Sequence, residues 1–307
     1  MTKGHHENLI KRVLKIAVGF LPAYLPGRIY QIASTVPLLK SLVNVTIKSI
    51  IPASIKITEG EILLNKSDVA VSGALALGMF EKRELAMLRS SIKNGMNVID
   101  IGANIGLYTV ISSRRVGPSG KVFAYEPEEE NFSLLSKNIE FNKLKNVTPI
   151  KMALANVAGN RTLYMAKDNK GHHSFSDDSS SDKKILVPTD TLDQSLIKYG
   201  SPKIDLIKMD IEGAEPLALE GMSGTISKNP NIIIFTEFYP KAIRRLGYDP
   251  INFLKSLSNF GFSIWVIDEN KAELEHLEVG QFGEFIQNFP RGEAFKNLYA
   301  SKTPYKY

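Results

Sequence analysis

Short, largely apolar runs alternate with segments of helical periodicity along most of the chain. Residues 98–101, 121–125 and 232–237 are runs of this kind. Apolar runs this short are typical of strands that are buried on both faces of a parallel sheet. Their alternation with helical segments predicts βαβ units, and therefore an α/β fold of Rossmann-like type with a mostly parallel sheet.

The same periodicity sets the approximate limits of the other elements. It predicts helices over residues 107–115, 128–142, 215–227 and 251–260. Residues 55–64 are predicted to form a hairpin that turns at Glu59 and Gly60. Further strands are expected over residues 147–153, 205–210 and 262–267, with a strand pair at residues 161–167 and 184–188.

A glycine-containing turn follows the strand over residues 98–101. Gly102 and Gly106 let the backbone bend tightly and approach a ligand closely. A dinucleotide site would have a further glycine where Asn104 stands. An acid followed by G-x-N-x-G instead suits a positively charged ligand without phosphates, such as S-adenosylmethionine, whose charge Asp100 can neutralise. The candidate cofactor contacts in this turn are Asp100, Gly102, Ala103, Asn104 and Gly106.

Two further positions are candidate cofactor contacts. Glu126 ends the second strand, where an acid in a Rossmann-like sheet accepts hydrogen bonds from both ribose hydroxyls. The alternative is that Glu126 only caps the helix over residues 128–142. Ala153 ends the third strand and is expected beside the adenine, although core packing explains an apolar residue there equally well.

Charged residues alternate at the end of the strand over residues 205–210. Lys208, Asp210 and Glu212 are expected to point together, because alternate strand residues share a face and open α/β sheets bind ligands at this end. Such a cluster indicates a functional cleft or a structural ion-pair network. Glu237 ends the next strand and is expected beside them, the alternative being a solvated acid at the sheet edge.

A set of short blocks forms a wider pattern from Gly78 onward. They are Gly78 to Glu81 with Glu84 and Leu85, and residues 98–109, 117–122, 125–127, 191–193 and 205–215. This pattern resembles the FkbM-type S-adenosylmethionine-dependent methyltransferases. The resemblance implies a class I methyltransferase sheet with an antiparallel final strand at residues 297–301, S-adenosyl-L-methionine as cofactor, and methyl transfer to a hydroxyl of a sugar or another metabolite.

The predicted reaction makes modest chemical demands on the protein. A methyl group on sulfur is already activated, so positioning carries most of the rate, but a hydroxyl acceptor also needs a general base. Asp210 and Glu212 are the first candidates by position, and His173 is the second because it lies in a loop that could close over the acceptor. The candidate catalytic residues are Asp210, Glu212, Lys208 and His173, and the candidate substrate contacts are Glu237 and His172.

Composition excludes several kinds of site. The 307 residues include no cysteine, which excludes disulfide scaffolds, thiolate metal sites and cysteine nucleophiles. A divalent metal on Asp210, Glu212 and Glu237 stays open, since hard cations choose oxygen ligands, but nothing in the spacing requires one. The length suffices for one core of about 200–230 residues with an appendage.

The net charge of +6 is concentrated in the first 56 residues. This arm has eight Lys and Arg residues against one Glu, so the other 251 residues are nearly neutral, which argues against a nucleic-acid substrate. Residues 9–20 are predicted to form a basic amphipathic helix that lies on an anionic membrane surface or packs on the catalytic domain. We therefore expect an N-terminal extension over residues 1–56 and a methyltransferase domain over residues 57–307.

The apolar part of the arm is predicted neither to span a membrane nor to be cleaved. Charges, Pro22 and Pro26 interrupt it well before the ~20 residues that a span requires, and it has no convincing small-residue cleavage site. We expect a cytoplasmic protein, with peripheral membrane contact through the arm left open.

Two other functions stay open beside a methyltransferase. A nicotinamide-dependent oxidoreductase is disfavoured by Asn104, and a non-catalytic membrane-surface binding protein is disfavoured by intact Asp100, Glu126 and Asp210. The acceptor is a small molecule or glycan whose identity stays open among sugar, lipid-linked glycan and polyketide hydroxyls and a nitrogen acceptor. The oligomeric state is open too.

Overall fold

The computed structural model describes residues 37–166, 173–177, 181–269, 271, 273–290 and 294–303. The predicted amphipathic helix at residues 9–20 and the candidate substrate contact His172 lie outside the described residues. In the described part of the chain, no helix is long and apolar enough to cross a bilayer.

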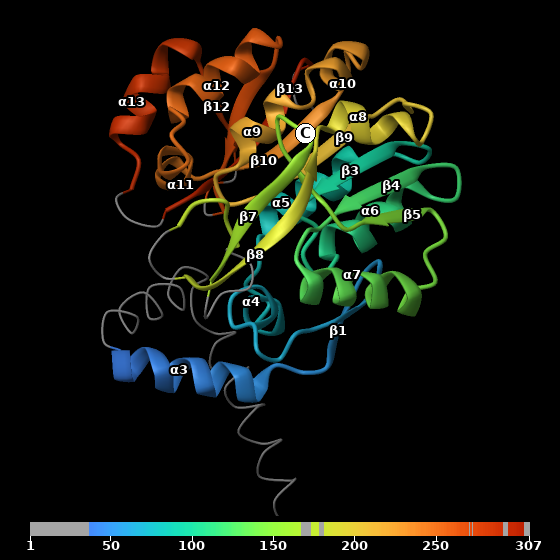
Figure 1. Cartoon of the computed structure of the whole chain (residues 1–307), viewed down its shortest axis with the longest axis vertical. Coiled ribbons are helices and arrows are strands. Elements are labelled where there is room, and N and C mark those ends of the chain that lie inside the picture. Colours follow the sequence, from blue (N-terminus) through green and yellow to red (C-terminus); the bar gives the residue numbers. More distant parts are fainter. Residues whose placement is uncertain are drawn as a thin grey trace, which may run out of the picture.

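An eight-stranded sheet runs through the centre of the domain in the order β12-β11-β13-β10-β9-β3-β4-β5 (Figure 1). Strands β3, β4, β5, β9 and β10 pair in parallel, whereas β13 runs antiparallel between β10 and β11. This confirms the predicted α/β sheet with its antiparallel final strand. The strands are β3 (Asn97–Ile101), β4 (Lys121–Tyr125), β5 (Val147–Ile150), β9 (Leu206–Met209), β10 (Ile233–Phe238), β11 (Ser263–Ile267), β12 (Glu275–Leu277) and β13 (Lys296–Ser301).

Helices cover both faces of this sheet because alternate strand residues point to opposite sides. Val98 and Leu206 pack against α4 (Val71–Ala76), α5 (Lys82–Ser91) and α6 (Leu107–Val116). Their sequence neighbours Ile99 and Ile207 pack on the opposite face. That face is covered by α8 (Leu192–Ile197), α9 (Glu215–Glu220), α10 (Ser223–Lys228), α11 (Pro240–Arg245), α12 (Pro250–Asn259) and α13 (Phe282–Gln287).

The first described elements dock on the domain through α7 (Glu129–Phe141). The predicted hairpin is present as β1 (Ser54–Ile57) and β2 (Gly60–Leu63). Asn138 of α7 accepts a hydrogen bond from the N–H of Leu63 at 2.7 Å and donates to its carbonyl at 3.2 Å. Helix α3 (Pro37–Ile50) precedes the hairpin at the foot of the domain (Figure 1). The predicted boundary at residue 56 therefore falls inside β1.

Two predicted elements are interrupted in the structure. The strand over residues 147–153 ends at Ile150, because the N–H of Met152 turns back to the Ile150 carbonyl at 3.0 Å. Residues Ala153–Leu154 form β6, which joins β7 (Gly159–Ala166) and β8 (Ser181–Asp190) in a second sheet of order β6-β8-β7. The helix over residues 215–227 breaks at Gly221, where a Cβ would lie 2.1 Å from the carbonyl oxygen of Ala155.

A comparison of Gly102, in the turn after β3, with Gly78 tests why position 102 requires glycine. Gly102 has a φ of +79°, and a Cβ there would lie 1.9 Å from the carbonyl oxygen of Asp210. Gly78 has a φ of +67° with nothing within 4 Å of its Cβ position, so it isolates the backbone effect. We expect Gly78→Ala to lower the free energy of unfolding by about 1–2 kcal/mol, and Gly102→Ala to cost ~1–3 kcal/mol more. Equal losses in urea unfolding would show that the contact with Asp210 is unimportant.

Candidate functional site

The turn between β3 and α6 folds over the end of β4. The N–H groups of Gly102 and Ala103 donate to the carbonyl oxygen of Tyr125 at 3.0 and 2.9 Å. Asn104 has a φ of +50°, and its N–H donates to Glu126 Oε2 at 2.8 Å. The residue that replaces a dinucleotide-type glycine is thereby tied directly to the acid that ends the next strand.

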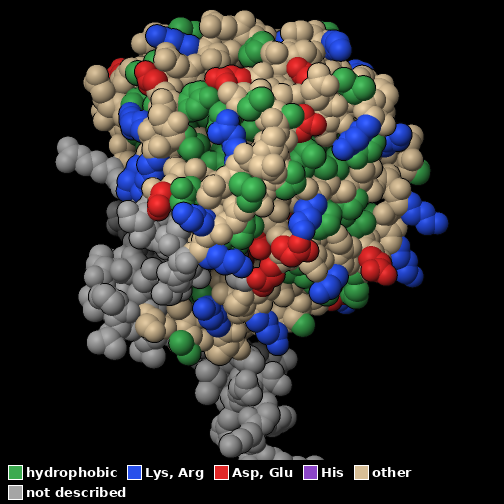
Figure 2. Space-filling model, in the orientation of Figure 1, with side chains coloured by type: hydrophobic (Ala, Val, Ile, Leu, Met, Phe, Trp, Pro, Cys, Tyr) green, Lys and Arg blue, Asp and Glu red, His purple; other side chains and the backbone are tan. Residues whose placement is uncertain are grey.

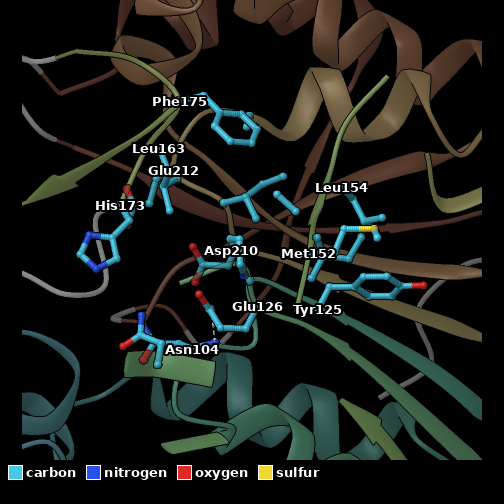
Figure 3. Close-up of a pocket in the computed structure, with 17 residues that line it drawn as sticks. Asn104, Tyr125, Glu126, Met152, Leu154, Leu163, His173, Phe175, Asp210 and Glu212 are labelled. Atoms are coloured by element: carbon cyan, nitrogen blue, oxygen red, sulfur yellow. Dashed lines mark hydrogen bonds between the residues drawn. The ribbon is translucent and has the colours of Figure 1, made fainter. Parts of the chain in front are cut away.

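A first cavity lies beside this turn, at the C-terminal ends of β3, β4 and β9 (Figure 3). Its polar lining includes Asn104, Glu126, Asp210 and Glu212. Apolar side chains of the second sheet and its neighbours, including Met152 and Phe175, line the remainder. A polar end beside an apolar end suits a ligand that combines charged and aromatic parts.

Glu126 is the polar residue in this cavity whose environment is most restricted. Its side chain is 5% exposed and also accepts from the N–H of Glu128 at 2.9 Å. Burial raises the pKa of Glu126 to about 7, although the backbone hydrogen bonds oppose that shift. Each carboxylate oxygen retains acceptor capacity, so the predicted hydrogen bonds from two ribose hydroxyls are compatible with this geometry.

A second cavity lies on the other side of Gly102, on the sheet face covered by α4, α5 and α6. Glu81, Tyr108 and Glu237 line it. Gly102, Asn104, Asp210 and Glu212 line both cavities, so the two sites meet at the turn and at the end of β9. Two ligands bound side by side would therefore meet beside the Asp210 carboxylate.

Acidic side chains gather where the cavities meet. Asp210, Glu212 and Glu237 each offer an oxygen within 4.8 Å of the others. Glu237 on β10 is 4% exposed, and burial, followed by repulsion from Glu212 and Asp210, raises its pKa well above the usual value. Such a set can accept a proton from a substrate or hold a hard cation.

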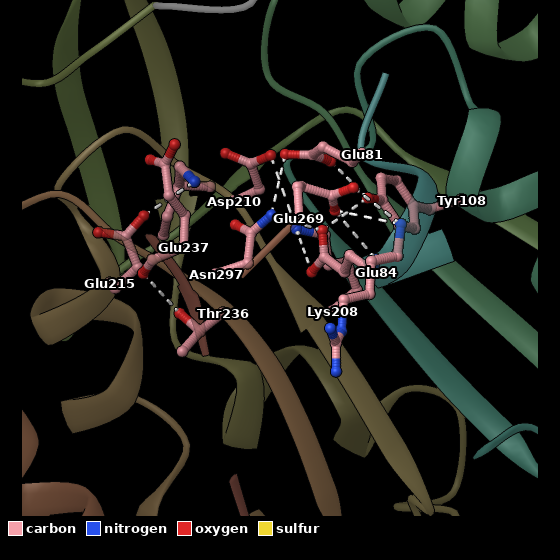
Figure 4. Close-up of polar contacts among 12 residues, drawn as sticks. Glu81, Glu84, Tyr108, Lys208, Asp210, Glu215, Thr236, Glu237, Glu269 and Asn297 are labelled. Carbon is pink, nitrogen blue, oxygen red and sulfur yellow. Dashed lines mark hydrogen bonds and ion pairs between the residues drawn. The ribbon is translucent and has the colours of Figure 1, made fainter. Parts of the chain in front are cut away.

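A buried ion-pair network stands behind this acid cluster (Figure 4). Lys208 is 1% exposed, and its Nζ lies 3.2 Å from Glu84 Oε1 and 3.7 Å from Asp210 Oδ2. Burial by itself would lower the pKa of Lys208, but the Glu84 and Asp210 carboxylates raise it above the usual value, so the ammonium stays charged. Glu84 also accepts hydrogen bonds from Tyr108 Oη at 2.7 Å and Asn297 Nδ2 at 2.9 Å.

Lys208 does point toward Asp210, with Nζ 3.7 Å from Oδ2, but it belongs to the ion-pair network that was the alternative to a place in the cleft. It lines neither cavity and points between α5 and α6, with Nζ 4.8 Å from the Tyr108 ring centroid. Glu212 lies beyond the end of β9 with a φ of +55°, which turns it toward Asp210 and Glu237. Lys208 therefore contacts Asp210 from outside both cavities.

Two predicted cofactor contacts also lie away from the cavities. Asp100 is 2% exposed, lines neither cavity and accepts a hydrogen bond from Thr109 Oγ1 at 2.5 Å, while burial raises its pKa to about 6. A Cβ on Gly106 would lie 2.7 Å from Leu135 Cδ1, so this glycine permits helix packing. Ala103 lines the second cavity, and Ala153 lines the first.

His173 is placed on the first cavity and not on the second. Its Nδ1 accepts a hydrogen bond from the N–H of Ala166 at 3.2 Å. The acids at the junction border the second cavity directly, so they are better placed than His173 to act on a molecule bound there.

Four residues of the polar network were not predicted to act with Lys208. Glu84 and Glu81 come from α5 and its start, Tyr108 from α6 and Asn297 from β13. A lysine within an apolar strand does indicate that some buried acid must pair with it. One sequence does not say which acid that is.

Known proteins resemble this chain in sequence. A family model described as the methyltransferase FkbM domain matches residues 100–264, more than half of the chain. The methyltransferase sdnD of Sordaria araneosa is 27% identical over 177 residues, covering 48% of this chain and 68% of that protein. The hexuronic acid methyltransferase AglP of Haloferax volcanii is 26% identical over 175 residues, covering 57% of this chain and 66% of that protein. The chain thus spans about two thirds of the length of these curated relatives.

The structural similarity to solved proteins is weaker. A SAM-dependent methyltransferase from Aquifex aeolicus is 16% identical, with a TM-score of 0.39 over 72% of this chain and 90% of that chain. The family assignment rests on the sequence match over residues 100–264 and not on this similarity.

The Lys208 pair is expected to contribute strongly to stability. Lys208→Met should lower the free energy of unfolding by about 3–5 kcal/mol, because it leaves Glu84 buried without its counter-charge. The double variant with Glu84→Gln should lose clearly less than the sum of the two single losses. Urea unfolding followed by circular dichroism measures all three, and strictly additive losses would contradict the pairing.

The raised pKa of Glu126 predicts that binding in the first cavity depends on pH. Only the ionised carboxylate can accept from two ribose hydroxyls with both oxygens, and protonation sets in as the pH falls through about 7. We expect the affinity for S-adenosylhomocysteine, measured by calorimetry, to fall by up to ~tenfold for each pH unit below that value. Glu126→Gln should bind weakly with little change over the same range. A wild-type affinity that is constant from about pH 8 to about pH 6 would refute the assignment.

Proposed function

The chain belongs to the FkbM methyltransferase family, and from this premise we propose that it transfers the methyl group of S-adenosylmethionine to a hydroxyl of a sugar or a related hydroxylated metabolite. Membership of this family favours methyl transfer from S-adenosylmethionine over the nicotinamide-dependent alternative. The family match gives methyl transfer, and we propose in addition that the acceptor atom is oxygen and that the acceptor is a sugar or a related metabolite.

The observation that carries this proposal is the junction of the two cavities at Asp210. The first cavity fits the methyl donor, because Glu126 is a buried acceptor for ribose and the apolar part beside Met152 and Phe175 suits an adenine. When bound, the cofactor supplies a methyl group already activated on sulfur. Gly102 lets the turn approach the Asp210 backbone closely, since a Cβ there has no room.

The second cavity fits the acceptor. It opens beside the same turn, so a hydroxyl bound there would lie on the far side of Gly102 and Asn104 from the ribose site. Asp210 borders both cavities, and Lys208 Nζ lies 3.7 Å from its Oδ2. In our proposal Asp210, helped by Glu212, orients the acceptor hydroxyl and takes its proton as the methyl group is transferred in line.

Two further observations favour a small hydroxylated acceptor. The relative AglP is named a hexuronic acid methyltransferase, and its likeness to this chain extends over 175 residues. On the face in Figure 2, Lys and Arg side chains are scattered among Asp, Glu and apolar side chains, whereas a nucleic-acid substrate would favour one continuous basic surface.

We predict that Asp210→Asn lowers kcat for methyl transfer by ~10²-fold or more, since it removes the proton acceptor at the junction. The measurement is transfer of labelled methyl from S-adenosylmethionine to a panel of hexoses, uronic acids and other vicinal diols. Asp205→Asn is the matched control, because Asp205 stands before the opposite end of β9 and pairs with Lys203 at 2.5 Å. Asp210→Asn with wild-type kcat would remove Asp210 from the mechanism, and transfer only to amines would overturn the oxygen acceptor.

A further inference from the structure

The acid cluster at the junction has the spacing of a cation site. Asp210 and Glu212 follow β9, and Glu237 lies on the neighbouring strand β10. One oxygen from each lies within 4.8 Å of the other two. Oxygens that bind one hard cation at about 2.0–2.6 Å lie no more than ~5 Å apart, so a single ion can contact all three.

Glu237 supplies an independent observation. Its side chain is 4% exposed, and its buried Oε2 has no hydrogen-bond partner among the described residues. The nearby amide of Asn297 donates instead to Glu81 at 3.0 Å and Glu84 at 2.9 Å. A carboxylate oxygen buried in this way is costly unless it is paired or bound to a cation. Glu237 points toward the other two acids (Figure 4 shows it near Asp210).

The negative charge of the second cavity also favours a bound cation. Four carboxylates, those of Glu81, Asp210, Glu212 and Glu237, line it, and its described lining includes no Lys or Arg. Lys208 does not line it, and its Nζ lies 3.2 Å from Glu84 Oε1 and 3.7 Å from Asp210 Oδ2. By itself this cavity would repel any acceptor that carries a carboxylate, and it offers few donors to neutral hydroxyl oxygens.

We propose that Asp210, Glu212 and Glu237 bind a divalent cation that prefers oxygen ligands, and that the methyl acceptor completes its coordination through two adjacent oxygens. The acceptor part rests on the proposed function, whereas the cation part does not. Three protein oxygens leave at least three of the usual six or more coordination positions for the acceptor and water. Each carboxylate keeps its second oxygen, so Asp210 can still take a proton.

Binding of Mn²⁺ to the full chain, without cofactor or acceptor, tests the cation site. The probe is the electron paramagnetic resonance signal of free Mn²⁺, which disappears on binding. We expect the wild type to bind Mn²⁺ in competition with Mg²⁺, and Glu237→Gln to weaken binding by at least ~tenfold. Glu81→Gln is the matched control: Glu81 lines the same cavity outside the cluster, so its loss should leave the affinity nearly unchanged.

Two results would overturn the cation site. One is the absence of Mn²⁺ binding at millimolar concentration by a wild type whose circular dichroism shows it folded. The other is equal weakening by Glu81→Gln and Glu237→Gln, which would indicate a diffuse attraction to negative charge. Asp210→Asn provides a second variant if Glu237→Gln does not fold, and it should weaken binding similarly.

Activity distinguishes this inference from the proposed function. Methyl transfer that stops in EDTA and returns with Mg²⁺ supports both parts. Full transfer in EDTA overturns the role of the cation while the proposed function stands. Mn²⁺ binding without transfer to any hydroxyl acceptor leaves the cation site intact and overturns the proposed function together with the acceptor part of the inference.

Discussion

The close approach of Gly102 to the backbone of Asp210 is the contact on which the site depends. It holds the β3–α6 turn against the end of β9, with no room for a side chain between them. Both cavities use these same two residues as a shared wall. Parallel strands end at one edge of a sheet, so the turn, the ribose acid Glu126 and the acids of β9 and β10 converge there. A glycine at this position is therefore a requirement of packing.

The second constraint is the cost of burying charge. The largely apolar layer between the sheet and α5 and α6 contains Lys208 and Glu237 from the sheet and Glu84 from α5. Lys208 is neutralised by Glu84, and that pair is completed by hydrogen bonds from Tyr108 and Asn297 to the carboxylate. In this network the positive charge of Lys208 is paired with the carboxylates of Glu84 and Asp210. Glu237 is left as a buried acid whose Oε2 has no hydrogen-bond partner among the described residues, and this is where we propose that a cation binds.

In the proposed function, the methyl donor binds in the first cavity and the acceptor in the second, on the two sides of one turn. The donor side is built from strand ends and the small second sheet, and its contacts depend largely on shape and on one buried acid, Glu126. The second cavity is built from α4, the residues before α5, α6, the acid cluster and the glycine turn itself, which it shares with the first cavity.

The sequence by itself determined the α/β sheet, the cofactor turn and the acids at the strand ends. Short apolar runs and glycine spacing are local patterns, and local patterns report strands, turns and the direction in which strands end. Only the tertiary structure decided that Asp100 faces Thr109, that Gly106 packs on Leu135 and that Lys208 pairs with Glu84. Each of these depends on which helix covers which face of the sheet. The partner of a buried charge is a neighbour in space, and that neighbour can lie far away in the chain, as Asn297 does from Glu84. No spacing within one segment can therefore reveal it.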